Sequence, residues 1–182
     1  MSWVVSNTSP LTNLAAIGQF HLLEALFGQL HIADAVWAEL NASGRSWPGR
    51  DEVAEAAWIS RHTVENRLLV RALALDLDQG ESESIALAIE QGAGLILLDE
   101  RDGRHRAQGL GLKIMGIVGV LLLAKQRGLL EAIKPSLDGL REQAGFYLST
   151  AVYEYALREA GEKTGVHSPP PTPVAGKPRP EG

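Results

Sequence analysis

The chain has 182 residues, of which 45% are hydrophobic and 21% charged. This composition is typical of a globular protein with one sizeable core. The absence of cysteine excludes disulfides, zinc–thiolate sites and thiol nucleophiles. The net charge of −5 disfavours a general nucleic-acid coat, but it does not exclude a nuclease whose acidic residues surround metal ions.

Short apolar runs of strand length alternate with helical patterns along the chain. The predicted strands are residues 3–5, 30–33, 58–64, 95–98 and 113–115, the last as an edge strand. The predicted helices are 10–17, 20–27, 34–40, 54–57, 80–91, 118–127, 130–143 and 151–160. This alternation predicts an α/β fold, an α/β/α sandwich around a central, mostly parallel sheet. Residues 42–51 are expected to form a loop, and residues 68–77 give an ambiguous pattern.

Several helix starts carry capping signals. Ser9 is predicted to cap the first helix, with Pro10 at its first position. Asp34 is predicted to cap the helix that follows the second strand. Asp78 and Glu81 have the spacing of a capping box.

Residues 1–161 are predicted to form one domain and residues 162–182 a flexible, proline-rich tail. The N-terminus lacks the features of a signal peptide. The most apolar run, residues 114–124, is too short to cross a bilayer. We therefore expect a soluble, cytoplasmic protein with no membrane contact.

Four oxygen-bearing side chains lie near the ends of predicted strands or on the predicted helices beside them. Asp99 ends the apolar run 95–98, Asn7 follows the first strand, Glu39 lies on the helix after the second strand, and Glu81 opens a helix. Open α/β sheets place their chemistry at the carboxyl ends of strands. A cluster of oxygen ligands without histidine or cysteine suits Mg²⁺ or Mn²⁺ better than zinc.

Three of these four residues also have a simpler explanation, whereas Asp99, which directly ends a buried apolar run, needs a partner or a cation. Glu81 could serve only in the capping box, Asn7 could cap the turn before Pro10, and Glu39 could be an ordinary solvent-facing helix residue. The basic residues that follow Asp99 could contact phosphates or could form a solvated helix face; they are Arg101, Arg104, His105 and Arg106.

Four segments in order carry a resemblance to a known family. They are Val-Val-Ser-Asn-Thr-Ser-Pro-Leu from residue 4, Ala-Val-Trp-Ala-Glu-Leu from residue 35, Gly-Glu-Ser-Glu-Ser-Ile-Ala-Leu-Ala from residue 80 and Leu-Leu-Asp-Glu-Arg-Asp-Gly-Arg from residue 97. Residues 111–121 add a glycine-spaced apolar segment. The chain resembles PIN-domain proteins, in particular the branch with a Gly-Glu-x-Glu-x-Ile-x-Leu-Ala signature, and is similar to VapC-type toxins.

The resemblance implies a ribonuclease that binds Mg²⁺ or Mn²⁺ and hydrolyses RNA. It places the four family acids, as catalytic and metal-binding residues, on Asn7, Glu39, Glu81 and Asp99. Ser9, Glu83 and Glu100 are expected to support them, and Arg101, Arg104 and Arg106 to hold the RNA backbone. The resemblance also implies an antitoxin protein as partner and a homodimer.

Asn7 departs from the family pattern, which has aspartate there. An amide oxygen can bind Mg²⁺ but brings no negative charge, so metal affinity should fall. The alternative is therefore a PIN-like module that binds RNA or protein and cleaves weakly or not at all. A third possibility is an α/β protein whose acids are only caps and surface charges.

Overall fold

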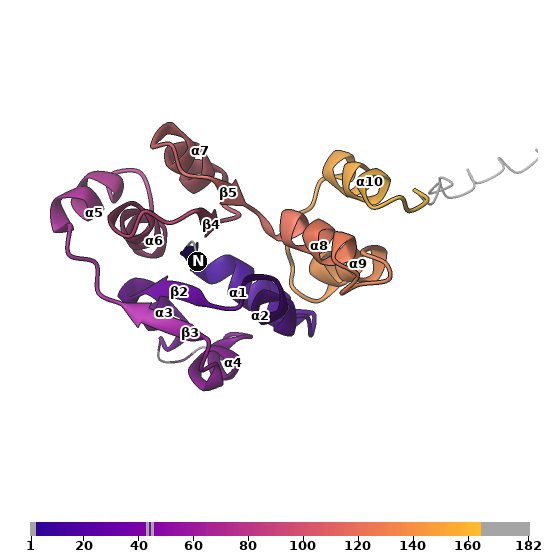
Figure 1. Cartoon of the computed structure of the whole chain (residues 1–182), viewed down its shortest axis with the longest axis horizontal. Helices are drawn as coiled ribbons and strands as arrows, with labels where there is room; N and C mark the ends of the chain where they lie inside the picture. The colour runs from indigo at the N-terminus through magenta and orange to yellow at the C-terminus, as the bar shows by residue number, and fades with distance from the viewer. Residues whose placement is uncertain (1–2, 43, 45, 165–182) are drawn as a thin grey trace, which may run out of the picture.

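The structure, a computed structural model, describes residues 3–42, 44 and 46–164. Five short strands form one sheet in the order β3-β2-β1-β4-β5, and every neighbouring pair is parallel (Figure 1). The strands are β1 (Val4–Ser6), β2 (Leu30–Ala33), β3 (Ile59–His62), β4 (Leu95–Leu97) and β5 (Ile114–Met115). The predicted parallel α/β fold is confirmed, as is the edge position of the strand near residue 114.

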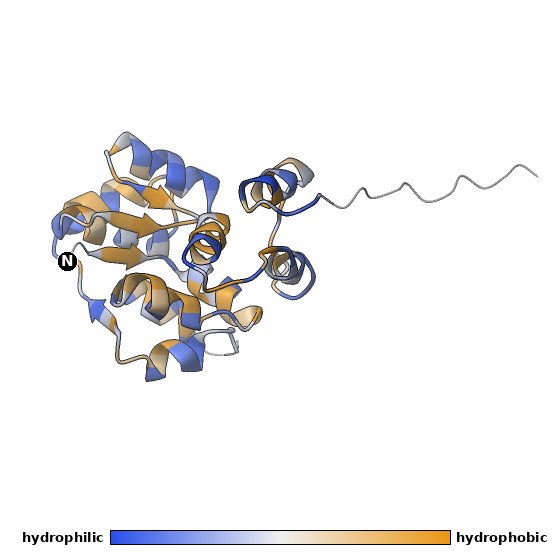
Figure 2. Ribbon diagram, turned by 45° about the vertical axis from the view of Figure 1, so that its right-hand side comes forward, coloured by the Kyte–Doolittle hydropathy of each residue, from blue (hydrophilic) through white to orange (hydrophobic). Residues whose placement is uncertain are grey.

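Helices cover both faces of the sheet, and the apolar strands lie between them (Figure 2). On one face, Leu30, Ile32 and Leu97 pack with side chains of α1, α2 and α8. On the other face, Val5 and Ile96 pack with α5, α6 and α7. The helices are α1 (Thr8–Ala16), α2 (His21–Phe27), α3 (Asp34–Leu40), α4 (Arg50–Glu55), α5 (Arg67–Leu73), α6 (Gln79–Glu90), α7 (Arg101–Gly109), α8 (Ile117–Gln126), α9 (Lys134–Glu142) and α10 (Thr150–Glu159).

The first helix begins earlier than predicted. Its N-cap is Asn7, whose side chain makes no capping hydrogen bond, and Ser9 lies inside the helix. The prediction of Ser9 as the cap was therefore wrong. The backbone N–H of Asn7 still donates to the carbonyl of Leu97, 3.0 Å away, so the chain leaves the sheet directly into the helix. Pro10 remains in the first turn, where its missing N–H leaves no hydrogen bond unmade.

The other predicted helix starts had mixed outcomes. The capping box of Asp78 and Glu81 is present at the start of α6. Asp34 is the first residue of α3 and not its cap, because its carboxylate accepts hydrogen bonds from Arg61 and Thr63. The ambiguous region contains α5, whose first turn is capped by the Asn66 side chain.

Two further boundaries differ from the sequence prediction. Helix α4 begins at Arg50, inside the segment expected to be loop, and ends at Glu55. Helix α9 begins only at Lys134, which puts Pro135 in its first turn instead of in a helix interior. Proline is favoured at that position because its backbone angle already suits a helix.

The predicted tail lies largely outside the described residues, which end at 164. Its first residue, Glu162, contacts the body of the domain. The Glu162 carboxylate accepts hydrogen bonds from the backbone N–H groups of Ile133 and Lys134, at 2.7 and 3.0 Å, and lies 3.4 Å from the Lys125 ammonium. Within the described residues, no helix is long and apolar enough to span a membrane.

Candidate active site

The site lies where the order of the strands changes direction. Strands β1 and β4 are neighbours, with Ser6 paired to Leu97. The chain leaves β1 toward β2 on one side, whereas β4 continues to β5 on the other. In open α/β sheets the crevice at this point receives ligands, because the connections on either side diverge from it. Asn7 and Asp99 follow these two strands and so begin the site.

Asn7 is buried without a hydrogen-bonding partner for its side-chain oxygen. The residue is 3% exposed, and its Oδ1 accepts no hydrogen bond from any residue that the structure describes. A buried amide oxygen normally has a partner, because losing water without one is costly. Asn7 lines a hollow of about 630 Å³ that it shares with Glu39, Asp78 and Glu100. Its oxygen is therefore available to a ligand, and the predicted role as a mere cap is not what the side chain does.

Asp99 also leaves one oxygen without a hydrogen bond. Oδ1 accepts from the backbone N–H of Ile117 at 2.8 Å, whereas the buried Oδ2 accepts none. The Ser9 hydroxyl faces the carboxylate and helps to lower its pKa, although it is not in hydrogen-bonding geometry with Oδ2. Burial outweighs this help and, with the negative charge of Glu100, raises the pKa of Asp99 to about 6. The positive charge of Arg104 offsets only part of this rise.

Glu81 combines the capping box with a second, unused oxygen. Its backbone N–H donates to Asp78 Oδ1 at 2.7 Å, and its Oε2 accepts from the Asp78 N–H at 3.3 Å. Its Oε1 is buried and has no partner, and the residue is 5% exposed. Burial, followed by the charge of Asp78, raises the pKa of Glu81 to about 7. The capping role and a ligand role are therefore compatible, because each uses a different oxygen.

Glu39 reaches the same region from α3. Its Oε2 accepts a hydrogen bond from the Thr8 hydroxyl, which ties α3 to the start of α1. Burial raises the pKa of Glu39; the Thr8 hydrogen bond opposes this, and the charge of Asp78 adds to it. Glu39 is thus more than a solvent-facing helix residue.

Three glycines make room for the acidic side chains. A Cβ on Gly80 would lie 2.3 Å from Glu39 Oε1, and a Cβ on Gly103 would lie 2.5 Å from Glu81 Oε1. On Gly116 it would lie 2.9 Å from Asp99 Oδ1. At separations this short, the carboxylate would have to move away from a new Cβ. Glycine at these three positions therefore lets the carboxylates lie where they do.

The expected supporting residues have different surroundings. Ser9 and Glu100 lie with the acids: both line the hollow that contains Asn7, and Glu100 raises the pKa values of Glu39, Glu81 and Asp99. Glu83 is turned elsewhere. Its carboxylate accepts from the Ala35 N–H at 3.0 Å and from Arg67 at 2.9 Å, so it joins α6 to α3 and α5.

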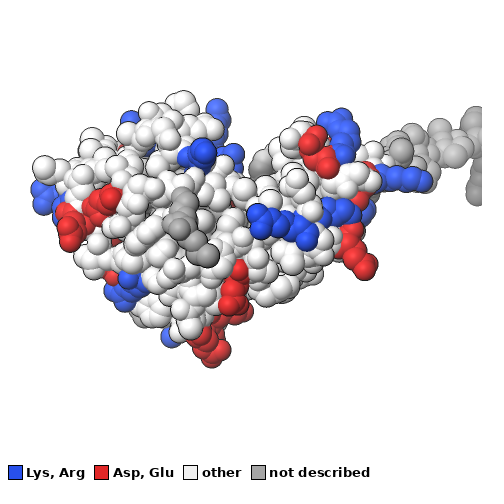
Figure 3. All heavy atoms as spheres, in the orientation of Figure 1, with Lys and Arg blue, Asp and Glu red and all other residues white. Residues whose placement is uncertain are grey.

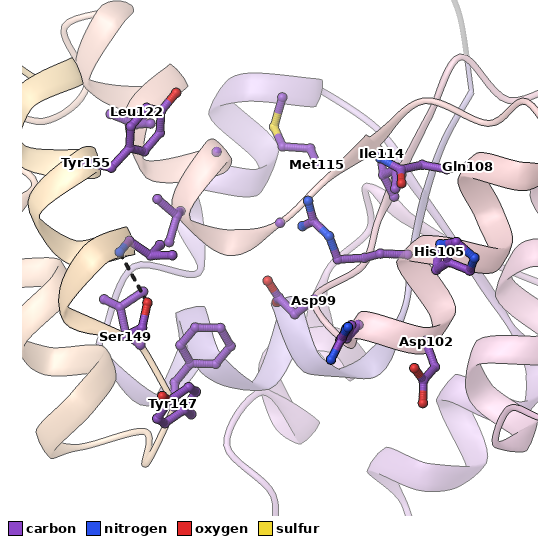
Figure 4. A pocket seen from close by; sticks show the side chains of 18 residues that line it. Asp99, Asp102, His105, Gln108, Ile114, Met115, Leu122, Tyr147, Ser149 and Tyr155 are labelled. Carbon is purple, nitrogen blue, oxygen red and sulfur yellow. Dashed lines mark hydrogen bonds between the residues drawn. The ribbon is translucent and has the colours of Figure 1, made fainter.

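The arginines of α7 also divide into two groups. Arg101 and Arg104 line a cleft of about 1040 Å³ that contains Asp99, whereas Arg106 forms an ion pair with Asp76. Arg104 donates to the Leu98 carbonyl at 3.4 Å and lowers the pKa of Asp99. Figure 4 shows the Asp99 carboxylate pointing into this cleft. The acidic residues therefore line two hollows: Asn7 and Glu39 line one, and Asp99 lines the other.

Most of the chain matches the model of a known protein family. Residues 3–162 match the family model of the DUF3368 PIN domain. The chain belongs to this PIN-domain family. The match includes every site residue discussed above and makes the chain a nuclease-type domain. No curated protein matches the chain.

The residues present in this PIN domain fit a hard divalent cation. Among the described residues, five buried side-chain oxygens have no hydrogen-bonding partner, and three of them belong to the site: Asn7 Oδ1, Glu81 Oε1 and Asp99 Oδ2. The other two, Gln19 Oε1 and Ser84 Oγ, belong to neutral side chains outside both hollows. The pKa values of Glu81 and Asp99 are raised mainly by burial and further by neighbouring acidic groups, which a bound cation would offset. Among the described residues, no three acidic, histidine or cysteine side chains form a ready-made metal-binding group. The donor chemistry therefore suits Mg²⁺ or Mn²⁺, while the side chains would have to move closer to hold it.

Sequence reasoning missed three contributors to the PIN-domain site. Asp78 was assigned only to the capping box, yet it lines the hollow and raises the pKa values of Glu39 and Glu81. Thr8 was not considered, although it holds Glu39. The glycine Gly103 had no local signal, because its importance comes from Glu81 on another helix.

Proposed function

We propose that the chain is a metal-dependent ribonuclease of the PIN-domain type, in which Glu39, Glu81 and Asp99 hold Mg²⁺ or Mn²⁺ and Asn7 completes the ligand set. The single observation that carries the proposal is the group of three buried, unpartnered oxygens on Asn7, Glu81 and Asp99. Unpartnered buried oxygens destabilise a fold unless a ligand uses them.

A bound divalent ion would supply an activated water and would stabilise the charge that develops on the phosphodiester. The chain's own residues would position that ion and the RNA. Thr8 orients Glu39 from the first turn of α1, and the backbone N–H of Ile117 orients Asp99. Arg101 and Arg104 line the adjoining cleft, where guanidinium groups suit phosphate oxygens.

The test is cleavage of mixed RNA by the purified chain in Mn²⁺, with and without EDTA. We expect that Asp99→Asn and Glu81→Gln each abolish cleavage. The matched control is Glu24→Gln, which removes the charge of an exposed glutamate on α2, outside both hollows. Cleavage that survives EDTA or Asp99→Asn would rule out the proposed chemistry.

A binding module without cleavage is the second candidate, and Asn7 favours it. An amide at this position gives the cation less charge compensation than an aspartate would. The absence of a ready-made three-residue metal group among the described residues points the same way. Retention of RNA in Mn²⁺ without cleavage, in the same experiment, would support this function over the first.

The resemblance to VapC-type toxins supports a finer proposal, in which the ribonuclease is the toxin of a toxin–antitoxin pair and acts as a homodimer. Induced expression of the chain should then arrest growth, and Asp99→Asn should relieve the arrest. Sedimentation of the purified chain measures its oligomeric state. Unimpaired growth with active, soluble protein would contradict a toxin role.

A further inference from the structure

The cleft at Asp99 has two chemically different walls. One wall is α7, which contributes Arg101, Arg104 and His105, together with Asp102. The opposite wall is formed by the segment between α9 and α10 and by α10 itself, and it contains Phe146, Tyr147 and Tyr155. Figure 4 shows Asp99 between the two walls, with His105 on one side and Tyr147 and Tyr155 on the other. The surface is visibly hollowed between the α7 side and the α10 side in Figure 3.

The aromatic wall is open to solvent. Tyr147 is 87% exposed and Tyr155 50% exposed. Within the described part of the chain, neither side chain makes a hydrogen bond or a ring contact. The neighbouring Tyr153 is different, because its hydroxyl donates to Asp138 at 2.6 Å and its ring lies 4.3 Å from the Arg141 guanidinium carbon. Tyr153 therefore holds α10 to α9, whereas Tyr147 and Tyr155 make no comparable contact with another described residue.

The basic wall complements an anion. Among the described residues, Arg101 makes no ion pair, and Arg104 donates one long hydrogen bond, to the Leu98 carbonyl, while its charge lowers the pKa of Asp99. The charge of Arg106, in contrast, is already used by Asp76. Asp102 offsets part of this charge, so the wall suits a few phosphates and not a long polyanion. Acidic and basic groups are interspersed over the face shown in Figure 3. Attraction of RNA phosphates would therefore depend on the local positive charge of the cleft and not on a charge of the whole face.

We propose that Tyr147 and Tyr155 form a stacking wall for unpaired bases of single-stranded RNA whose phosphates contact Arg101 and Arg104. The RNA backbone would then cross the cleft over Asp99. This inference rests on the proposed function and assigns the residues that would hold the bases and phosphates of the RNA. Exposed aromatic rings bind bases by stacking on their faces, and a base inside a duplex has no free face to offer. The cleft also has apolar lining residues between its two walls, among them Ile114, Met115 and Leu122, which a protein segment could cover. The guanidinium groups of one wall, facing the exposed rings of the other, favour RNA as the occupant.

Binding can be measured without cleavage by fluorescence anisotropy of a labelled, unstructured RNA oligomer in EDTA. Three probes are compared: the oligomer, an abasic oligomer of equal length, and the duplex of the same sequence. The variants are Tyr147→Ala, Tyr155→Ala and the conservative Tyr147→Phe. The matched control is Leu68→Ala, which removes a 77% exposed apolar side chain from α5, outside the cleft.

We expect each tyrosine-to-alanine change to weaken binding of the single strand by about 5- to 150-fold, equivalent to ~1–3 kcal/mol. Binding of the abasic oligomer should not change, Tyr147→Phe should retain the wild-type affinity, and the duplex should bind more weakly. Unchanged affinity in both alanine variants, or equal wild-type affinity for the single strand and the abasic oligomer, would overturn the stacking wall.

The two proposals fail in different ways. Metal-dependent cleavage with no effect of the tyrosines removes the stacking wall and leaves the nuclease. Tyrosine-dependent binding without cleavage in Mn²⁺ removes the nuclease and leaves the stacking wall. If the oligomer does not bind to the wild-type chain, the stacking wall is rejected and a protein becomes the better occupant of the cleft.

Discussion

Glu81 and Glu83 are buried carboxylates two residues apart on the same helix, yet their surroundings are opposite. Glu83 is satisfied by the Ala35 N–H and by Arg67. Glu81 leaves Oε1 without a partner, and its pKa is raised to about 7. Burial of an acid therefore does not identify a functional site by itself. What distinguishes Glu81 from Glu83 is a buried carboxylate oxygen without a hydrogen-bonding partner among the described residues, together with a raised pKa.

The comparison predicts opposite effects of one chemical change. Glu83→Gln should lower the free energy of unfolding by about 2 kcal/mol, because it breaks the ion pair with Arg67 and weakens the link to α3. Urea denaturation measures this loss. Arg67→Gln serves as the partner variant, and a double variant no less stable than either single one would confirm that the two act together. An unchanged unfolding midpoint in Glu83→Gln would contradict the structural role.

Glu81→Gln should instead raise the free energy of unfolding by ~1.5 kcal/mol at pH 8 without metal. The folded-state pKa of Glu81 is raised from its ordinary 4.5 to about 7, so its favourable contribution is present below pH 4.5 and is lost as the pH rises through 7. The wild type should therefore lose stability over that window, and the variant less so. Urea denaturation at several pH values tests this, and a variant less stable than the wild type at pH 8 would refute it.

Asn7→Asp should raise the affinity of the site for Mn²⁺, whereas the same change elsewhere in the fold should not. We expect Mn²⁺ to bind at least about tenfold more tightly, because the ion gains a nearby negative charge. Isothermal titration calorimetry measures the affinity. Asn66→Asp adds the same charge at the start of α5 and preserves a capping oxygen, so it should leave Mn²⁺ binding unchanged. Equal gains from both variants, or no gain from Asn7→Asp, would argue against Asn7 as a ligand.

The smallest expected effect concerns the space around Glu81. Gly103→Ala should weaken Mn²⁺ binding by about threefold, because the new methyl group displaces the Glu81 carboxylate. Gly109→Ala, on the same helix, meets no atom within 4 Å and should only stabilise the helix, by about 0.5 kcal/mol. Calorimetry and thermal unfolding separate the two effects. Equal Mn²⁺ affinities in both variants would show that Gly103 has no part in placing Glu81.

The fold and the position of the site could be predicted from the sequence because both follow local patterns. The apolar run before Asp99 and the capping box at Glu81 are visible in a few consecutive residues, and both are present in the structure. The start of α1 was misplaced because the hydrogen bond of Asn7 to Leu97 joins residues 90 positions apart. The surroundings of the two glutamates could not be predicted, because Glu81 lies beside Gly103 and Glu83 is bound by Ala35 and Arg67. These partners are distant in the sequence, and no local pattern indicates such contacts.

The contacts of Glu162 bear on how this chain can be shortened. Its carboxylate receives the first free N–H groups of α9 and neutralises the Lys125 ammonium. An expression fragment that stops at residue 161 would leave those N–H groups to water and loosen the junction of α8, α9 and α10. Because α10 carries one wall of the Asp99 cleft, a fragment without Glu162 would also disturb that wall and change the measured RNA affinity. Fragments intended for such work should retain position 162.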